Sequence, residues 1–181
     1  MLRFLLIVAV ALCSAPSVSS AQQASKVYRV GFLSYGGCPI RPDIMGPFRQ
    51  GLRELAYVEG QNIIIECRGA PGAADRLSGF AAELVRLKVD VLVTQNTATA
   101  LAAKQATKTI PIVMVNVGDP VGSGLVTSLA RPGGNVTGLS FLAPDLVPKA
   151  LEFLKAAAPS VSRVAVWMDP TNPGQTLTDK Q

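Results

Sequence analysis

The residues of this sequence that could do chemistry are mostly uncharged polar side chains placed directly after apolar runs. Gln95, Asn96 and Thr97 follow one such run at 89–94, and Asp119 follows another. An apolar run that ends in a polar loop and then enters a helix is typical of a parallel sheet, whose ligands lie outside the carboxyl ends of the strands. The pattern therefore indicates a binding cleft for a small molecule.

The sequence gives little support to a catalytic function. The chain contains no histidine, which excludes Ser-His-Asp and Cys-His catalysis as well as histidine metal ligation. Glycine fingerprints of dinucleotide and phosphate sites are also missing after the first strand. Asp119 and Asp169 are the remaining pair for acid/base chemistry, but carboxylates at strand ends are common in binding sites. We expect a protein that is not an enzyme and uses no metal or cofactor.

The candidate ligand-binding residues lie at the carboxyl ends of predicted strands or in the loops that follow them. Each also has a structural interpretation as a cap or turn residue, most plainly Thr97 at a helix start, Asp119 before Pro120 and Asn172 before Pro173. Tyr35 follows a central strand and is placed to stack on a ligand. The full candidate set is Ser34, Tyr35, Gln95, Asn96, Thr97, Asn116, Asp119, Ser140, Asp169 and Asn172.

The elements that must position these residues alternate along the chain. Apolar runs predict strands, and apolar residues spaced three or four apart predict helices. Such alternation predicts an α/β fold, a three-layer sandwich with a parallel sheet and right-handed crossovers. The expected strands are 27–34, 62–66, 89–94, 112–117 and 135–140; the expected helices begin between 43 and 47, near 77, at 97 and at 120, the last ending near 130.

Helix starts at the carboxyl edge of the sheet add an electrostatic argument. Free backbone N–H groups at residues 95–97 and 119–120 would favour an anion such as a carboxylate. Each helix start contributes about 0.3 to 1 kcal/mol, whereas micromolar affinity needs about 8 kcal/mol. The helix starts would therefore orient a ligand, and side chains must supply most of the binding.

The two ends of the chain differ from its middle. Residues 1–21 have the basic start, short apolar core and small-residue cleavage site of an export signal. Residues 22–141 form the predicted α/β lobe. In residues 142–181 the pattern restarts with a helix at about 145–158 and a strand at 163–167. We expect this last part to be the first helix and strand of an incomplete second lobe.

The cysteines and the charge of the chain indicate its compartment and limit the classes of partner that it could bind. After signal removal Cys38 and Cys67 remain, and in an oxidising compartment they form either a disulfide or two separate thiols. The formal net charge is +5, yet no two Lys or Arg residues are adjacent. Without a basic cluster, a nucleic-acid groove has little support.

Six motifs occur along the chain in this order: QGLREL (50–55), VEGQN (58–62), QAT (105–107), IPIV (110–113), VGDPVGSGL (117–125) and SLARPGGNVTGLS (128–140). With these motifs the chain resembles a bacterial family of extracytoplasmic substrate-binding proteins of ABC transporters. The resemblance covers roughly residues 27–173 and implies a two-lobed, type I periplasmic-binding-protein fold that closes on a small molecule. It also implies a membrane permease as partner, a periplasmic or extracytoplasmic location, and possible amino-acid ligands.

Other interpretations follow from the same residues. The chain is alternatively a ligand-sensing lobe of a signalling protein, or a truncated fragment without function. Ala56 stands where relatives usually have glycine, which implies a left-handed residue there. Cys67 and Gly69 replace aromatic residues that relatives often show, so the ligand type does not carry over. With one lobe incomplete, we expect weak ligand binding or none.

Overall fold

The computed structural model describes residues 26–69, 71–141 and 143–165. Five parallel strands form one sheet in the order β2-β1-β3-β4-β5. Because the strands are parallel, all of their carboxyl ends lie at one edge. The strands are β1 (Tyr28–Ser34), β2 (Ile63–Gly69), β3 (Val91–Thr94), β4 (Ile112–Val117) and β5 (Val136–Ser140).

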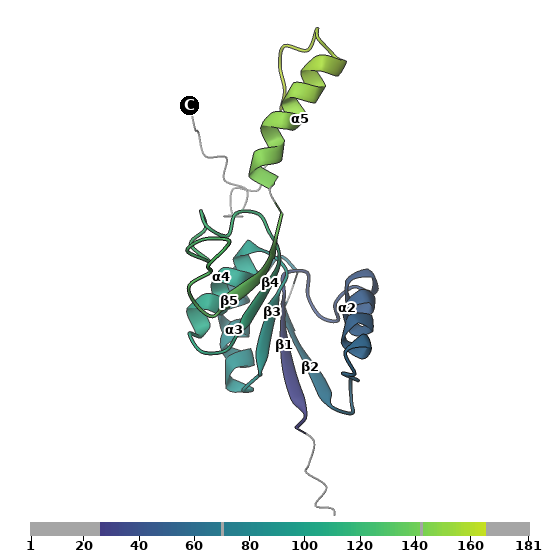
Figure 1. Ribbon diagram of the computed structural model, residues 1–181, viewed down its shortest axis with the longest axis vertical. Helices are drawn as coiled ribbons and strands as arrows, with labels where there is room; N and C mark the ends of the chain where they lie inside the picture. The colour runs from purple at the N-terminus through teal and green to yellow at the C-terminus, as the bar shows by residue number, and fades with distance from the viewer. Residues whose placement is uncertain (1–25, 70, 142, 166–181) are drawn as a thin grey trace, which may run out of the picture.

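Helices cover both faces of this sheet, as Figure 1 shows. The helix α2 (Pro42–Glu54) lies on one face, while α3 (Leu77–Arg86) and α4 (Thr97–Ala106) lie on the other. A short 3-10 turn, η1 (Ala74–Arg76), leads into α3, and α5 (Ala143–Ala157) extends away beyond the end of the sheet. The predicted three-layer α/β sandwich with a parallel sheet is confirmed.

Strand alternation divides the core into two apolar layers. The larger layer lies between the sheet and the pair α3–α4 and includes Leu33, Leu84 and Leu92, each fully buried. The smaller layer lies between the sheet and α2 and includes Phe32 and Val93. Neighbouring residues of one strand, such as Phe32 and Leu33, thus face opposite layers.

The predicted helix at 120–130 is wrong. This segment is a series of turns, in which Val126 N–H bonds to Pro120 O and Gly124 N–H bonds to Val121 O. Gly124 adopts a positive φ of 71°, and the Thr127 hydroxyl donates to the Arg131 carbonyl. Glycine and hydroxyl side chains favour such turns over a helix. The expected helix-start anion site at 119–120 is therefore also wrong.

Two further boundaries differ from the sequence-based expectation. Helix α2 begins at Pro42, and Pro47 lies inside it rather than at its start. Proline at the first helical position needs no hydrogen-bond partner for its nitrogen, so Pro42 begins the helix well. Of the predicted strand at 163–167, residues 163–165 are in no strand and the rest lies outside the described residues.

Other expectations concern single residues and the chain ends. Ala56 has a φ of 63°, which confirms the left-handed conformation. Cys38 and Cys67 form a disulfide, which decides between the two alternatives left open by the sequence. The predicted export signal at 1–21 lies outside the described residues. Among the helices that the structure describes, none has the length and apolar character needed to cross a membrane.

Candidate functional site

A pocket of about 430 Å³ opens at the carboxyl edge of the sheet, on the face covered by α2. It lies where the strand order changes direction, since the chain proceeds from β1 outward to β2 and then returns to the other side of β1 with β3. In open α/β sheets, ligands bind at this switch point. The pocket is lined by Phe32, Ile44, Phe48, Val93, Gln95, Asn96, Val115 and Asn116.

Gln95 is oriented by a buried serine on the other side of the switch point. The hydroxyl of Ser34, at the end of β1, donates to Oε1 of Gln95 over 3.0 Å. Ser34 is buried, whereas Gln95 is half-buried. With Oε1 engaged, the Nε2 amide group is the part of Gln95 left for the pocket, and it carries two donors.

Asn96 is oriented by its role as the cap of α4. Its Oδ1 accepts from the backbone N–H of Thr99 over 2.9 Å, and the Thr99 hydroxyl accepts from the backbone N–H of Asn96 over 3.1 Å. This reciprocal pair is a capping box. The cap leaves Nδ2 of Asn96 as a second donor group, because the amide oxygen is already engaged.

Apolar side chains form the rest of the wall. The rings of Phe32 and Phe48 meet edge to face, with centroids 5.7 Å apart and planes at 80°. Val93 and Val115 continue this surface across β3 and β4, and Ile44 adds to it from α2. The pocket thus combines an aromatic and aliphatic wall with amide groups at its rim.

Asn116 is the third residue with a side-chain amide in the pocket lining, after Gln95 and Asn96. It lies at an irregularity between β4 and β5, where the register shifts between Met114 and Val117. Its φ is 62°, a conformation that asparagine tolerates better than most residues. The bulge brings its side chain to the pocket instead of continuing the strand alternation.

The structure places the other predicted site residues away from the pocket lining. Tyr35 is half-buried and packs against the core layer of α3 and α4, so it is not a solvent-facing platform. Thr97 is buried as the first residue of α4. The Asp119 carboxylate accepts from the Gly122 N–H over 2.7 Å and closes a turn. Ser140 is half-buried at the end of β5.

Two predicted residues, Asp169 and Asn172, lie outside the described residues. Conversely, the sequence analysis missed the apolar wall. Phe32 and Val93 stand two positions before Ser34 and Gln95, and strand alternation puts residues at this spacing on one face. That alternation was the signal from which these two wall residues could have been found.

The pocket carries no formal charge on its described lining residues. Its polar groups are amides, and the two that are oriented by internal hydrogen bonds present donors. In the part of the chain that the structure describes, His, Cys, Asp and Glu side chains do not gather in threes as a metal site requires. The arrangement is chemically suited to bind an apolar molecule that carries a hydrogen-bond acceptor, such as a carboxylate.

Comparisons with known proteins agree with this geometry. The family model described as "ABC transporter substrate binding protein" matches residues 38–176. A tyrosine-binding protein of Clostridioides difficile (strain R20291) is 39% identical over 120 residues, which are 66% of this chain and 34% of that protein.

Solved structures give the same result. A conserved domain protein from Vibrio cholerae has a TM-score of 0.71 and 36% identity, covering 82% of this chain and 50% of that one. An ABC domain in complex with L-Trp from Streptococcus pneumoniae has a TM-score of 0.57 and 32% identity, covering 62% of this chain and 38% of that one. This chain thus spans half or less of the length of these relatives.

The family match extends over more than half of the chain and includes α2, α5 and every pocket residue except Phe32. It agrees with the parallel α/β sheet and with a pocket at the strand ends. This chain belongs to the ABC transporter substrate-binding protein family.

Proposed function

We propose that this chain is the solute-binding component of an ABC importer and that its pocket binds an amino acid with an apolar, aromatic side chain. The observation that carries the proposal is the pairing of two oriented amide donors, on Gln95 and Asn96, with the wall built by Phe32 and Phe48. Donors of this kind match a ligand carboxylate, and the rings match an aromatic side chain.

The first turn of α4 supplies further donors for a carboxylate. In any α-helix the first N–H groups have no partner within the helix, and here these belong to Thr97 and Ala98. They directly follow Asn96, which lines the pocket. The partial positive charge of the helix start adds to the attraction for an anion.

The relatives support the same ligand class. One is named for tyrosine binding, and another was solved in complex with L-Trp. We extend that class to this chain because its pocket holds aromatic side chains and carries no formal charge that would select a basic or acidic side chain.

The transport role rests on the family. We propose that residues 1–21 direct export, that residues 22–141 make up the first lobe, and that residues 142–181 begin a second lobe. The partner would be a membrane permease that receives the ligand outside the cytoplasm. Together these proposals describe an extracytoplasmic receptor for amino-acid import.

A matched set of ligands tests the binding proposal. L-tryptophan and L-tyrosine are compared with tryptamine and tyramine, which keep the ring and the amine but lack the carboxylate. One lobe buries only part of a ligand, so we expect dissociation constants of about 0.1 to 1 mM for the amino acids. The decarboxylated amines should bind at least tenfold more weakly, measured by NMR titration.

The lining residues should report the contact. Amide signals of Gln95 and Asn96 are expected to shift with the amino acids and to remain in place with the amines. Equal affinity for tryptophan and tryptamine would contradict the carboxylate assignment. Binding of no amino acid up to 10 times the expected range, about 10 mM, would overturn the proposed ligand class.

A further inference from the structure

We propose that the disulfide between Cys38 and Cys67 is a positioning element for the ligand pocket, because it fixes the half of α2 that forms one wall. The binding part of this inference rests on the proposed function. Cys38 lies in the loop that leads from β1 into α2, and α2 contributes Ile44 and Phe48 to the pocket. The position of this loop therefore affects the shape of the wall.

The other end of the disulfide lies beside the pocket on the sheet. Cys67 pairs in register with Phe32 of the neighbouring strand, and Phe32 is itself a pocket residue. The Cα atoms of the two cysteines are 6.1 Å apart, although the residues are separated by 29 positions. The disulfide thus joins the loop before α2 to the strand pair β1–β2. Phe32 of β1 is the ring that contacts Phe48 of α2.

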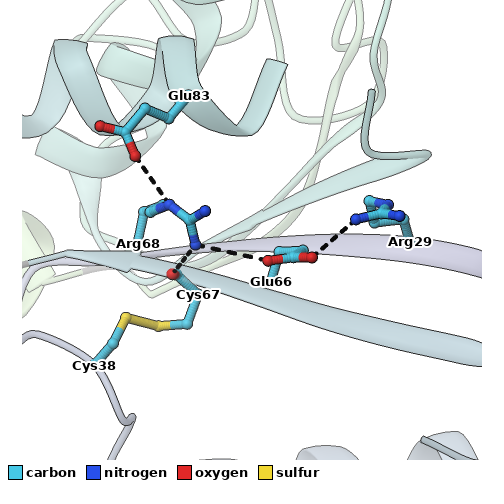
Figure 2. A network of polar contacts seen from close by, with 6 residues as sticks. All are labelled: Arg29, Cys38, Glu66, Cys67, Arg68 and Glu83. Carbon is cyan, nitrogen blue, oxygen red and sulfur yellow. Dashed lines mark hydrogen bonds and ion pairs between the residues drawn. A yellow bond between two sulfur atoms is a disulfide. The ribbon is translucent and has the colours of Figure 1, made fainter. Parts of the chain in front are cut away.

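Cys67 is a firm anchor because its neighbours tie β2 to α3 and to β1. Figure 2 shows the guanidinium of Arg68 between the Cys67 carbonyl and Glu83. Its Nη1 donates to the carbonyl over 2.7 Å, and its Nε donates to Glu83 over 2.9 Å. Glu66 also pairs with Arg29 of β1 over 2.9 Å. These contacts hold the backbone around Cys67 against two other elements.

Side-chain packing attaches α2 to the sheet less firmly than it attaches α3. Within α2, all of which the structure describes, Met45 is the single buried residue. The shorter helix α3 buries Leu77, Phe80, Ala81 and Leu84. Phe48 and Leu52 of α2 pack against the same layer but are only partly buried. Since buried apolar surface is the main force that attaches a helix to a sheet, α2 depends more than α3 on a covalent link in the loop that precedes it.

The test compares the wild-type chain with a variant that lacks the disulfide. This cysteine variant carries two substitutions, Cys38→Ser and Cys67→Ala. Serine replaces Cys38 because that position is exposed, and alanine replaces Cys67 because that residue packs against the apolar layer under α2. Leu84→Ala is the matched control, because it destabilises the whole fold from the opposite layer and leaves the disulfide intact. Backbone hydrogen exchange is measured in all three proteins.

We expect the amides of residues 44–51 to lose at least tenfold more protection in the cysteine variant than in Leu84→Ala, while the α4 amides lose a similar amount in both. If the amides of α2 and α4 lost protection from exchange equally in both variants, the inference would be overturned. If the cysteine variant fails to fold, wild-type protein is reduced with dithiothreitol in the presence of sucrose and measured instead. In that reaction two thiols form on the protein as dithiothreitol closes to its own disulfide.

A binding measurement separates this inference from the proposed function. L-tryptophan affinity should fall at least fivefold in the cysteine variant and less than twofold in folded Leu84→Ala protein. An unchanged affinity in the cysteine variant would show that the disulfide does not position the pocket. If the wild-type chain binds no amino acid, the proposed function fails, and the exchange of residues 44–51 alone decides the inference.

Discussion

The hydroxyl of Ser34 and the side-chain amide of Gln95 meet across the switch point of the sheet, with Oγ 3.0 Å from Oε1. The two residues are 61 positions apart in the sequence. Ser34 is the last residue of β1, and Gln95 directly follows the neighbouring strand β3. The contact fixes which end of the Gln95 amide faces the pocket. A hydrogen bond within the protein thereby determines the polarity that a ligand meets.

Ser34→Ala should weaken L-tryptophan binding roughly fivefold, because loss of one hydrogen bond worth about 1 kcal/mol frees the Gln95 amide to rotate. NMR titration measures the affinity. Ser140→Ala is the matched control, since Ser140 also ends a strand but does not line the pocket. An equal effect of both substitutions would show that the Ser34 contact does not orient the site.

Substitutions of Asn96 should separate its two roles. Asn96→Asp keeps a good cap for α4, so the free energy of unfolding should change by less than about 0.5 kcal/mol. The same change replaces the donor group with a negative charge, and binding of L-tryptophan should fall at least tenfold.

Asn96→Ala removes the cap as well and should cost about 1 kcal/mol of stability, within the usual range of 0.5 to 2 kcal/mol. Urea unfolding and NMR titration report the two effects independently. Normal tryptophan affinity in Asn96→Asp protein would argue against a carboxylate at this position.

Loss of the disulfide should lower global stability. A cross-link that spans 29 residues restricts the unfolded chain by about 3 to 4 kcal/mol in the loop-entropy model. Urea unfolding of the Cys38→Ser, Cys67→Ala variant against oxidised wild type measures the difference. A loss below about 1 kcal/mol would show that the cross-link restricts the unfolded chain much less than its length predicts.

Stability should also depend on acid through Asp90. Hydrogen bonds from the Lys26 ammonium and the Arg29 backbone N–H lower the pKa of the Asp90 carboxyl below its usual 3.8. A carboxyl whose pKa is lower in the folded state stabilises the fold above its unfolded pKa, and this contribution is lost as the pH falls through the folded pKa.

Asp90→Asn should therefore be less stable than wild type at pH 7, and the difference should shrink as the pH falls below 3.8 and through the lowered pKa of the folded state. Urea unfolding at pH 7 and at pH 2.5 provides the comparison. Because Asn can still accept the Arg29 N–H, the substitution isolates the charge from the hydrogen bond. A difference that does not vary with pH would assign the effect to packing.

The sequence predicted the layered sheet because its strands are continuous apolar runs and its helices have one apolar face. The runs at 89–94 and 112–117 predicted two strands, which the structure has as Val91–Thr94 and Ile112–Val117. Asn96 was found as a ligand candidate from its place after a strand, and the pocket lining contains it. These are local signals, which depend only on near neighbours along the chain.

Local signals failed where side chains compete with the helix for backbone groups. The segment after Asp119 has an apolar spacing that suits a helix, yet its glycines and its Thr127 hydroxyl stabilise turns instead. Tyr35 has the position of a ligand platform in the sequence, but it packs into the layer of α3 and α4. The direction of a side chain after a strand ends is not fixed by alternation.

By itself, the sequence determined the fold class, the edge of the sheet where polar groups gather and the family to which the chain belongs. Only the tertiary structure decided which of those groups share a pocket, that Phe32 and Phe48 form its wall, and that Cys38 meets Cys67. The reason is physical: periodicity encodes which face of an element is apolar, whereas contacts between distant residues depend on how strands order and helices pack in three dimensions.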